Sequence, residues 1–186
     1  MFKTTVRFTA LSLICFGFAC SGQMNEANKL VDEANAIIKS YNSDSTKSGQ
    51  LMTELLGENL KKAEDIDEYK KDNKAKFDEL VGLNDKLEKA GADATAKFDQ
   101  ASKLDLDDKF KEYLTLKAQE MRKRSELDKQ TTTFVKTFLD TKETDKLDAL
   151  IADFNKNSAD TQKAADEIME KANKITKDNP GVFKSN

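Results

Sequence analysis

The sequence predicts an all-α protein, an elongated antiparallel up-and-down bundle of three to five long helices after an N-terminal signal segment. From Met24 onward, apolar residues recur at the spacing of one helical face, and no stretch alternates as a half-buried strand would. The chain of 186 residues contains a single proline, and the breaks between helical stretches are short. Short breaks favour consecutive helices that are antiparallel neighbours.

The first part of the predicted bundle holds two apolar runs separated by turn-forming residues. A helix is predicted from about Met24 to Tyr41, and the Asn, Ser, Asp and Gly residues within 42–49 are predicted to end it. Segment 48–64 carries the second run, with the same helical period. The pattern allows this segment to be a separate helix or the beginning of the long helix that follows.

Three longer helices are predicted to complete the bundle. The first covers 66–101, where Gly91 marks either a kink or an earlier helix end. The second covers 108–139 and is preceded by Asp107, whose side chain suits an N-cap. The third covers 144–177, with its Thr as cap, and is ended by a Pro-Gly pair. Helices of about 35 residues are about 50 Å long.

Residues 27–39 align without gaps to residues 165–177. The similarity reflects either an internal duplication or the shared Ala, Asn and Lys content of two amphipathic helices, and the sequence leaves both open. In either case both segments are expected on a core face of the bundle rather than in a repeat array, because nothing recurs at a fixed period elsewhere.

Composition excludes several classes of function. The chain has no His, so imidazole bases, catalytic triads built on them and His metal ligands are absent. Its 31 basic and 34 acidic residues give a net charge of -3, so the chain lacks the excess of positive charge that binding to nucleic acid phosphates requires. There is no glycine-rich phosphate loop, and no cofactor is expected.

Acidic residues are the remaining candidates for a catalytic or metal-binding site. Clusters such as Glu64, Asp67 and Glu68, or the acids of 105–108, fall close together on predicted helices or turns. The second cluster lacks the glycine and ligand spacing of a calcium loop, and no metal site is predicted. A hydrolase would need two acids buried together in environments that separate their pKa values. Solvated helix faces explain such clusters in a chain this rich in acids, so the protein is not expected to be an enzyme.

The N-terminus has the organisation of a secretory signal. Lys3 and Arg7 precede an apolar run of about a dozen residues, which is too short for a stable membrane span. Removal of residues 1–19 takes away those two basic residues and no acidic one, so the net charge becomes -5. The predicted organisation is signal peptide 1–19, lipidated end and tether 20–24, helical bundle 25–178 and flexible tail 179–186.

The sequence Gly17-Phe18-Ala19-Cys20 resembles the lipobox of bacterial lipoproteins, although Gly17 replaces the Leu usual at that position. The resemblance implies that Cys20 becomes the diacylated N-terminus and attaches the chain to a membrane. Ser21 after the Cys then favours an outer membrane, at its periplasmic face or at the cell surface. The alternative is cleavage by an ordinary signal peptidase after Ala19, which would give a periplasmic or secreted protein.

The run Arg122-Lys123-Arg124 is the one local feature that suggests a binding surface. Both arginines that remain after processing lie here, in the middle of a predicted long helix. Arginine can bind a carboxylate or phosphate through two hydrogen bonds, so a docking patch is one interpretation. The other is an exposed face whose cations pair with Glu120 and Glu126 at helical spacing.

The leading hypothesis is a non-catalytic, lipid-anchored envelope protein with a structural or protein-interaction role and an envelope protein as partner. The alternative is a soluble periplasmic or secreted bundle that carries a hydrophobic ligand. That alternative rests on small and polar residues in the predicted core, at Asn84, Gly91 and Thr131. The sequence does not indicate an oligomeric state.

Overall fold

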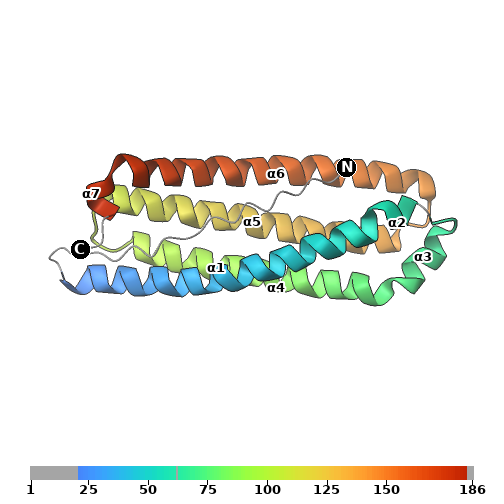
Figure 1. Cartoon of the computed structure of the whole chain (residues 1–186), viewed down its shortest axis with the longest axis horizontal. Helices are drawn as coiled ribbons and strands as arrows, with labels where there is room; N and C mark the ends of the chain where they lie inside the picture. The colour runs from blue at the N-terminus through green and yellow to red at the C-terminus, as the bar shows by residue number, and fades with distance from the viewer. Residues whose placement is uncertain (1–20, 62, 184–186) are drawn as a thin grey trace.

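Four long helices form the body of the protein in the computed structural model, which describes residues 21–61 and 63–183. The long helices are α1 (Ser21–Leu56), α4 (Lys74–Ser102), α5 (Asp108–Asp140) and α6 (Thr144–Asp178). The short ones are α2 (Glu58–Lys61), α3 (Ile66–Asp72) and α7 (Pro180–Phe183). Successive long helices run in opposite directions along the long axis (Figure 1), and the described residues contain no strand. The predicted all-α antiparallel bundle is therefore confirmed.

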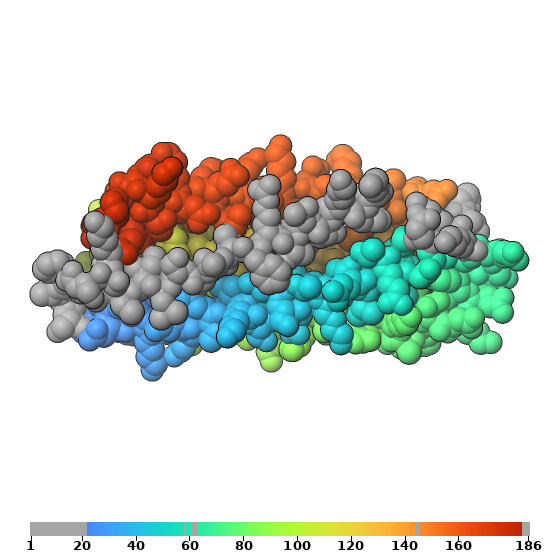
Figure 2. All heavy atoms as spheres, viewed as in Figure 1, coloured from blue at the N-terminus to red at the C-terminus, as the bar shows by residue number. Residues whose placement is uncertain are grey.

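The long helices pack in chain order, α4 on α1, α5 on α4 and α6 on α5. The helices α1 and α6 lie along opposite long edges of the molecule (Figure 2). With 36 residues, α1 is about 54 Å long. Its first turn and α7 lie at one end of the rod, whereas α2 and α3 lie at the other (Figure 1).

The predicted break at 42–49 is wrong, because α1 continues through these residues. Contacts with α4 hold this polar stretch in the helix. Asp44 forms an ion pair with Lys86, with 2.7 Å between Oδ2 and Nζ, and the hydroxyl of Ser48 donates to Oδ1 of Asn84 at 3.2 Å. Tertiary packing thus overrides the local turn preference.

Segment 48–64 is divided, since its first part completes α1 and residues 58–61 form α2. The single helix predicted for 66–101 is also divided, at Asn73, into α3 and α4. Asp65 starts α3 as an N-cap, since its Oδ1 accepts hydrogen bonds from two backbone amides, at 2.8 and 3.0 Å. Side-chain capping of this kind stabilises a helix by about 1 kcal/mol.

Two further helix ends test the sequence predictions. Asp107 caps α5 as predicted, because its Oδ1 accepts from the amides of Lys109 and Phe110 at 2.8 and 3.4 Å. At α6, Glu143 rather than Thr144 occupies the N-cap position, and it makes no side-chain capping bond. Extended backbone at Glu143 places Thr144 inside the helix.

The C-terminal residues also differ from the prediction of a flexible tail for 179–186. Residues 180–183 form α7, and the ring of Phe183 is buried. The ring centroid of Phe183 lies 5.9 Å from that of Phe110 and 5.3 Å from that of Tyr113, both edge-on. The last described turn therefore packs onto α5 at the end of the rod where α1 begins.

The core is divided into two apolar clusters. The first lies toward the beginning of α1 and contains Ala27, Ala34, Ile38, Tyr41, Leu87, Ala94, Phe98, Ala101, Leu106, Phe110, Leu114, Ala118, Met121 and Phe183. The second lies toward α2 and α3 and contains Leu51, Leu55, Leu56, Phe77, Leu80, Phe134, Val135, Phe138 and Leu147. Between them is a polar band of buried side chains, namely Ser48, Asn84, Asp128, Thr131 and Thr132.

The two similar segments, 27–39 and 165–177, occupy core faces as expected. Ala27 and Ala34 of α1 are 0% exposed, and their counterparts in the alignment, Ala165 and Ala172 of α6, are 1% and 0% exposed. The shared alanines therefore mark the inward-facing side of each helix.

Candidate functional site

Four charged residues lie on one face of α5 in the middle of the bundle. They are Lys117, Glu120, Arg124 and Asp128, whose spacings of three or four residues place them one above another. Lys117, Glu120 and Asp128 are buried, and the side chain of Arg124 is 25% exposed. We call this set the charge ladder. Charged residues are rarely buried without partners, so the ladder is the most unusual chemical feature of the described structure.

Glu120 is fully compensated within the ladder. Its Oε1 accepts a hydrogen bond from Nε of Arg124 at 2.9 Å, and its Oε2 accepts one from Nζ of Lys117. Nη2 of Arg124 in turn lies 4.0 Å from Sδ of Met169, so this side chain also reaches α6. Two cations on one buried carboxylate provide the ion pairing and hydrogen bonds that burial of its charge requires.

Asp128 is surrounded differently. Its Oδ2 accepts a hydrogen bond from the hydroxyl of Tyr41 on α1 at 2.6 Å. Among the described residues, no Lys or Arg nitrogen forms an ion pair with it. Burial raises the pKa of Asp128 to about 7, against the opposing effects of the Tyr41 hydrogen bond and the charge of Arg124. Burial, together with the nearby Asp128, also raises the pKa of Tyr41 well above its usual value.

Other polar pairs join the helices at the same height. On α4, Asn84 donates to the hydroxyl of Ser48 at 3.0 Å and to the carbonyl of Leu80 at 2.8 Å. On α5, Gln130 donates to the hydroxyl of Thr161 of α6 at 3.0 Å. Specific hydrogen bonds therefore join α1 to α4 within the polar band, and α5 to α6 beside it.

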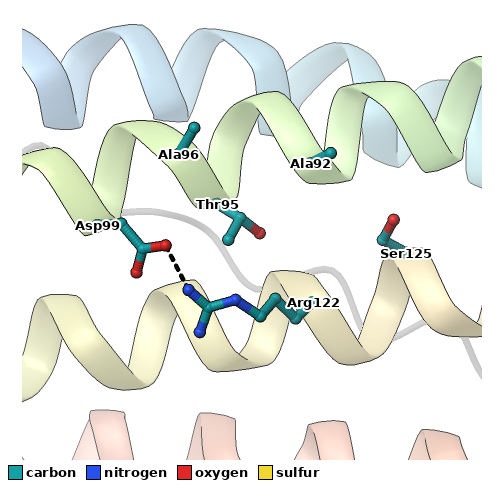
Figure 3. A pocket seen from close by; sticks show the side chains of 6 residues that line it. All are labelled: Ala92, Thr95, Ala96, Asp99, Arg122 and Ser125. Atoms are coloured by element: carbon teal, nitrogen blue, oxygen red, sulfur yellow. Dashed lines mark hydrogen bonds and ion pairs between the residues drawn. The ribbon is translucent and has the colours of Figure 1, made fainter.

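The structure places Arg122, Lys123 and Arg124 in three separate ion pairs. Arg122 crosses to Asp99 of α4 (Figure 3) and lines an open groove of about 310 Å³ between α4 and α5. Lys123 is 40% exposed and pairs with Glu126 at 2.6 Å. Arg124 belongs to the charge ladder. The pairing with Glu120 and Glu126 expected at helical spacing is thus observed; the side chain of Arg124 is only 25% exposed, whereas those of Arg122 and Lys123 are 52% and 40% exposed.

The spacing of the four ladder residues is visible in the sequence, but their burial is not. Lys117 and Glu120, three residues apart, are typical of an exposed ion pair on a helix surface. Their inward position follows from the packing of α5 against its neighbours, which the local sequence does not encode. Ala118 and Met121 are also buried, on the adjacent face of the same helix.

The remaining candidates for chemistry are dispersed. Among the described residues, no group of three or more metal-ligating side chains could hold a metal ion. Asp107 is used as a helix cap, and Glu64, Asp67 and Glu68 are exposed. The two buried acids Glu120 and Asp128 are eight residues apart on α5, about 12 Å, and do not form a close carboxylate pair. Cys20 lies outside the described residues.

No helix in the described part of the chain is long and apolar enough to cross a bilayer. Comparison with known proteins found no matching family, no matching curated protein and no matching solved structure.

Proposed function

We propose that the processed chain is a non-catalytic envelope protein, held at a membrane by lipid on Cys20, with a structural or protein-interaction role. The observation that carries this proposal is the position of Cys20. It ends a lipobox-like motif, and the next residue, Ser21, is the first of α1. A lipid on this Cys would attach one end of the rod, with α1 extending about 54 Å along it.

The end of the rod away from Cys20 is suited to present a fixed surface. Lys70 of α3 donates to the carbonyl of Thr141 in the connection between α5 and α6. Its ammonium also lies 5.1 Å from the ring centroid of Phe138, a cation–π distance. These contacts hold the two connections at this end together, so a partner would meet an ordered shape.

The character of the surface supports polar contacts with such a partner. Every described Leu, Ile, Val, Met, Phe and Tyr side chain is buried or half-buried, and the exposed positions are mostly charged or small. A large exposed apolar patch would have favoured insertion of the rod itself into a membrane. A polar rod attached at one end supports the role of spacer or docking protein.

The carrier alternative has less support at the positions that motivated it. Asn84 is hydrogen-bonded to Ser48, Thr131 donates to the carbonyl of Leu127 at 2.9 Å, and Gly91 faces Ser125. The polar groups at Asn84 and Thr131 therefore have protein partners, and α5 closely approaches Gly91. Native mass spectrometry of protein purified from cells distinguishes the two roles, because a carrier would retain a bound lipid mass.

The anchor is tested by metabolic labelling with an alkynyl fatty acid. We expect label on the wild-type protein, its loss in Cys20→Ser, and its retention in Cys15→Ser, which removes the other Cys of the chain. Absence of label from the wild type, or undiminished label in Cys20→Ser, would show that the chain is not anchored in this way.

The interaction role is tested by photo-crosslinking in cells. A crosslinking amino acid at exposed Lys71, at the far end, or at Lys123, on the side, should capture a specific envelope protein. The same amino acid at exposed Lys29, near the anchored end, is the matched control. Capture of no partner from either test position at native expression would refute a docking function. The double variant Arg122→Gln with Lys123→Gln tests the side position separately, by whether capture of the partner is lost.

A further inference from the structure

Tyr41 and Asp128 meet at mid-length of the bundle, where the first apolar cluster gives way to the polar band. We propose that these two residues form a pH-sensitive latch between α1 and α5, closed while Asp128 is protonated and released when its carboxylate ionises. The latch is a conformational device of the fold and does not depend on the anchoring or the interaction role proposed above.

The first argument is the contrast between the two buried carboxylates of the charge ladder. Glu120, 4% exposed, has a cation on each oxygen. Asp128, 5% exposed, has the neutral hydroxyl of Tyr41. A buried carboxylate without a paired cation is the group whose ionisation a folded protein tolerates least. Ionisation of Asp128 therefore favours any opening that lets water reach it.

The second argument is the electrostatic environment contributed by each neighbouring helix. On α5, the charge of Arg124 partly offsets the rise that burial causes in the pKa of Asp128. Nε of Arg124, however, donates its hydrogen bond to Glu120. On α4, Glu88 adds a negative charge that opposes ionisation, and α1 contributes Tyr41. No charged group of α6 among the described residues acts on Asp128. The Tyr41 hydrogen bond and Arg124 favour the ionised form, but burial together with Glu88 outweighs them, so the protonated form is favoured on balance.

The third argument is mechanical. The bond from Tyr41 joins α1 directly to α5, whereas α1 otherwise packs mainly on α4. Farther along α1, Ser48 is bonded to Asn84 and the second apolar cluster begins at Leu51. Release of the latch is therefore confined to the middle of α1, and the two ends of this helix stay packed.

The direction of the pH effect follows from linkage. Burial raises the pKa of Asp128 to about 7, above that of an aspartate in an unfolded chain. A carboxyl of this kind stabilises the closed state at low pH, and this contribution is lost as the pH rises through the raised pKa. From pH 5.5 to 8.5, opening should become about 30-fold more favourable when the open state has an ordinary aspartate pKa.

Hydrogen exchange measured by mass spectrometry on the purified protein tests the latch. After correction for intrinsic exchange rates, we expect amide protection within 38–45 to fall about 30-fold from pH 5.5 to 8.5. Asp128→Asn should remove this fall and keep the segment protected at both pH values. Asp85→Asn, which removes an exposed acid on α4 bonded to Thr132, should leave the fall unchanged.

Protection that does not change with pH in the wild type, or an equal fall in Asp128→Asn, would overturn the proposal. A second measurement needs no variant and remains informative when Asp128→Asn fails to fold. Carboxyl ¹³C NMR of the wild-type protein should give a titration midpoint for Asp128 of about 7. A midpoint near the ordinary value of about 4 would overturn the proposal equally.

Discussion

Substitution by alanine at two glycines of α4 should change the free energy of unfolding in opposite directions. Gly91 is buried, and a Cβ built on it would lie 2.9 Å from Cβ of Ser125 on α5. The hydroxyl of Ser125 also donates to the carbonyl of Glu88 at 2.9 Å, which holds α5 close to α4 at this point. Gly82 is exposed, and a Cβ built there would meet no atom within 4 Å.

The magnitudes follow from two opposing effects. Glycine to alanine in an exposed helix interior stabilises by about 1 kcal/mol, because glycine loses more backbone entropy on folding. Forcing an extra carbon into a packed interface costs about 1–3 kcal/mol. We expect Gly82→Ala to raise the free energy of unfolding by about 0.5–1 kcal/mol. Gly91→Ala should lower it by up to about 2 kcal/mol, since the packing cost outweighs the helix gain.

Urea unfolding followed by circular dichroism at the helix band gives both values. The difference between the two variants isolates the packing cost, because the change in helix propensity is common to both. Adding Ser125→Gly to Gly91→Ala removes the opposing Cβ, and the double-mutant cycle should show a favourable coupling of about 1–3 kcal/mol. Equal stabilisation by Gly91→Ala and Gly82→Ala would refute the close approach of α4 and α5.

Three further substitutions test other parts of the fold by the same unfolding measurement. Phe138→Ala should destabilise by about 3–5 kcal/mol because this ring is 0% exposed, and a loss under 1 kcal/mol would contradict its burial. Glu120→Gln should destabilise by about 3 kcal/mol since it leaves Lys117 and Arg124 without their anion; a neutral effect would show that the ladder is hydrated. Asp107→Ala should cost about 1 kcal/mol and increase hydrogen exchange in the first turn of α5; unchanged exchange there would contradict the cap.

The class of fold was predictable because the apolar period of α5 and α6 is nearly continuous and their flanking residues are strong breaks. Asp107 and the Pro-Gly pair after α6 act through local chemistry, which a sequence reveals directly. The continuation of α1 through residues 42–49 could not be predicted from local sequence. Its residues 42–49 favour turns locally and are helical because α4 binds them through Lys86 and Asn84.

The candidate site was less predictable than the fold. The arginine-containing run drew attention through its composition, but the side chains of consecutive helical residues diverge by about 100° each, so they reach different surroundings. The residues that share an environment are three or four positions apart and carry charges that are common on helix surfaces. Only the packing of α4 and α6 against α5, together with Tyr41 of α1, distinguishes Asp128 from an exposed aspartate.

The division of the core has a consequence for how the rod loses structure. Each apolar cluster contains its own buried aromatic rings, with Phe98 and Phe110 in one and Phe77 and Phe138 in the other. Between them the helices are joined by hydrogen bonds, each worth about 1 kcal/mol, and by the Asp44–Lys86 ion pair. Damage to one end therefore propagates weakly to the other. We therefore expect the two apolar clusters to unfold as separate cooperative units, so that one end of the rod can open while the other stays folded.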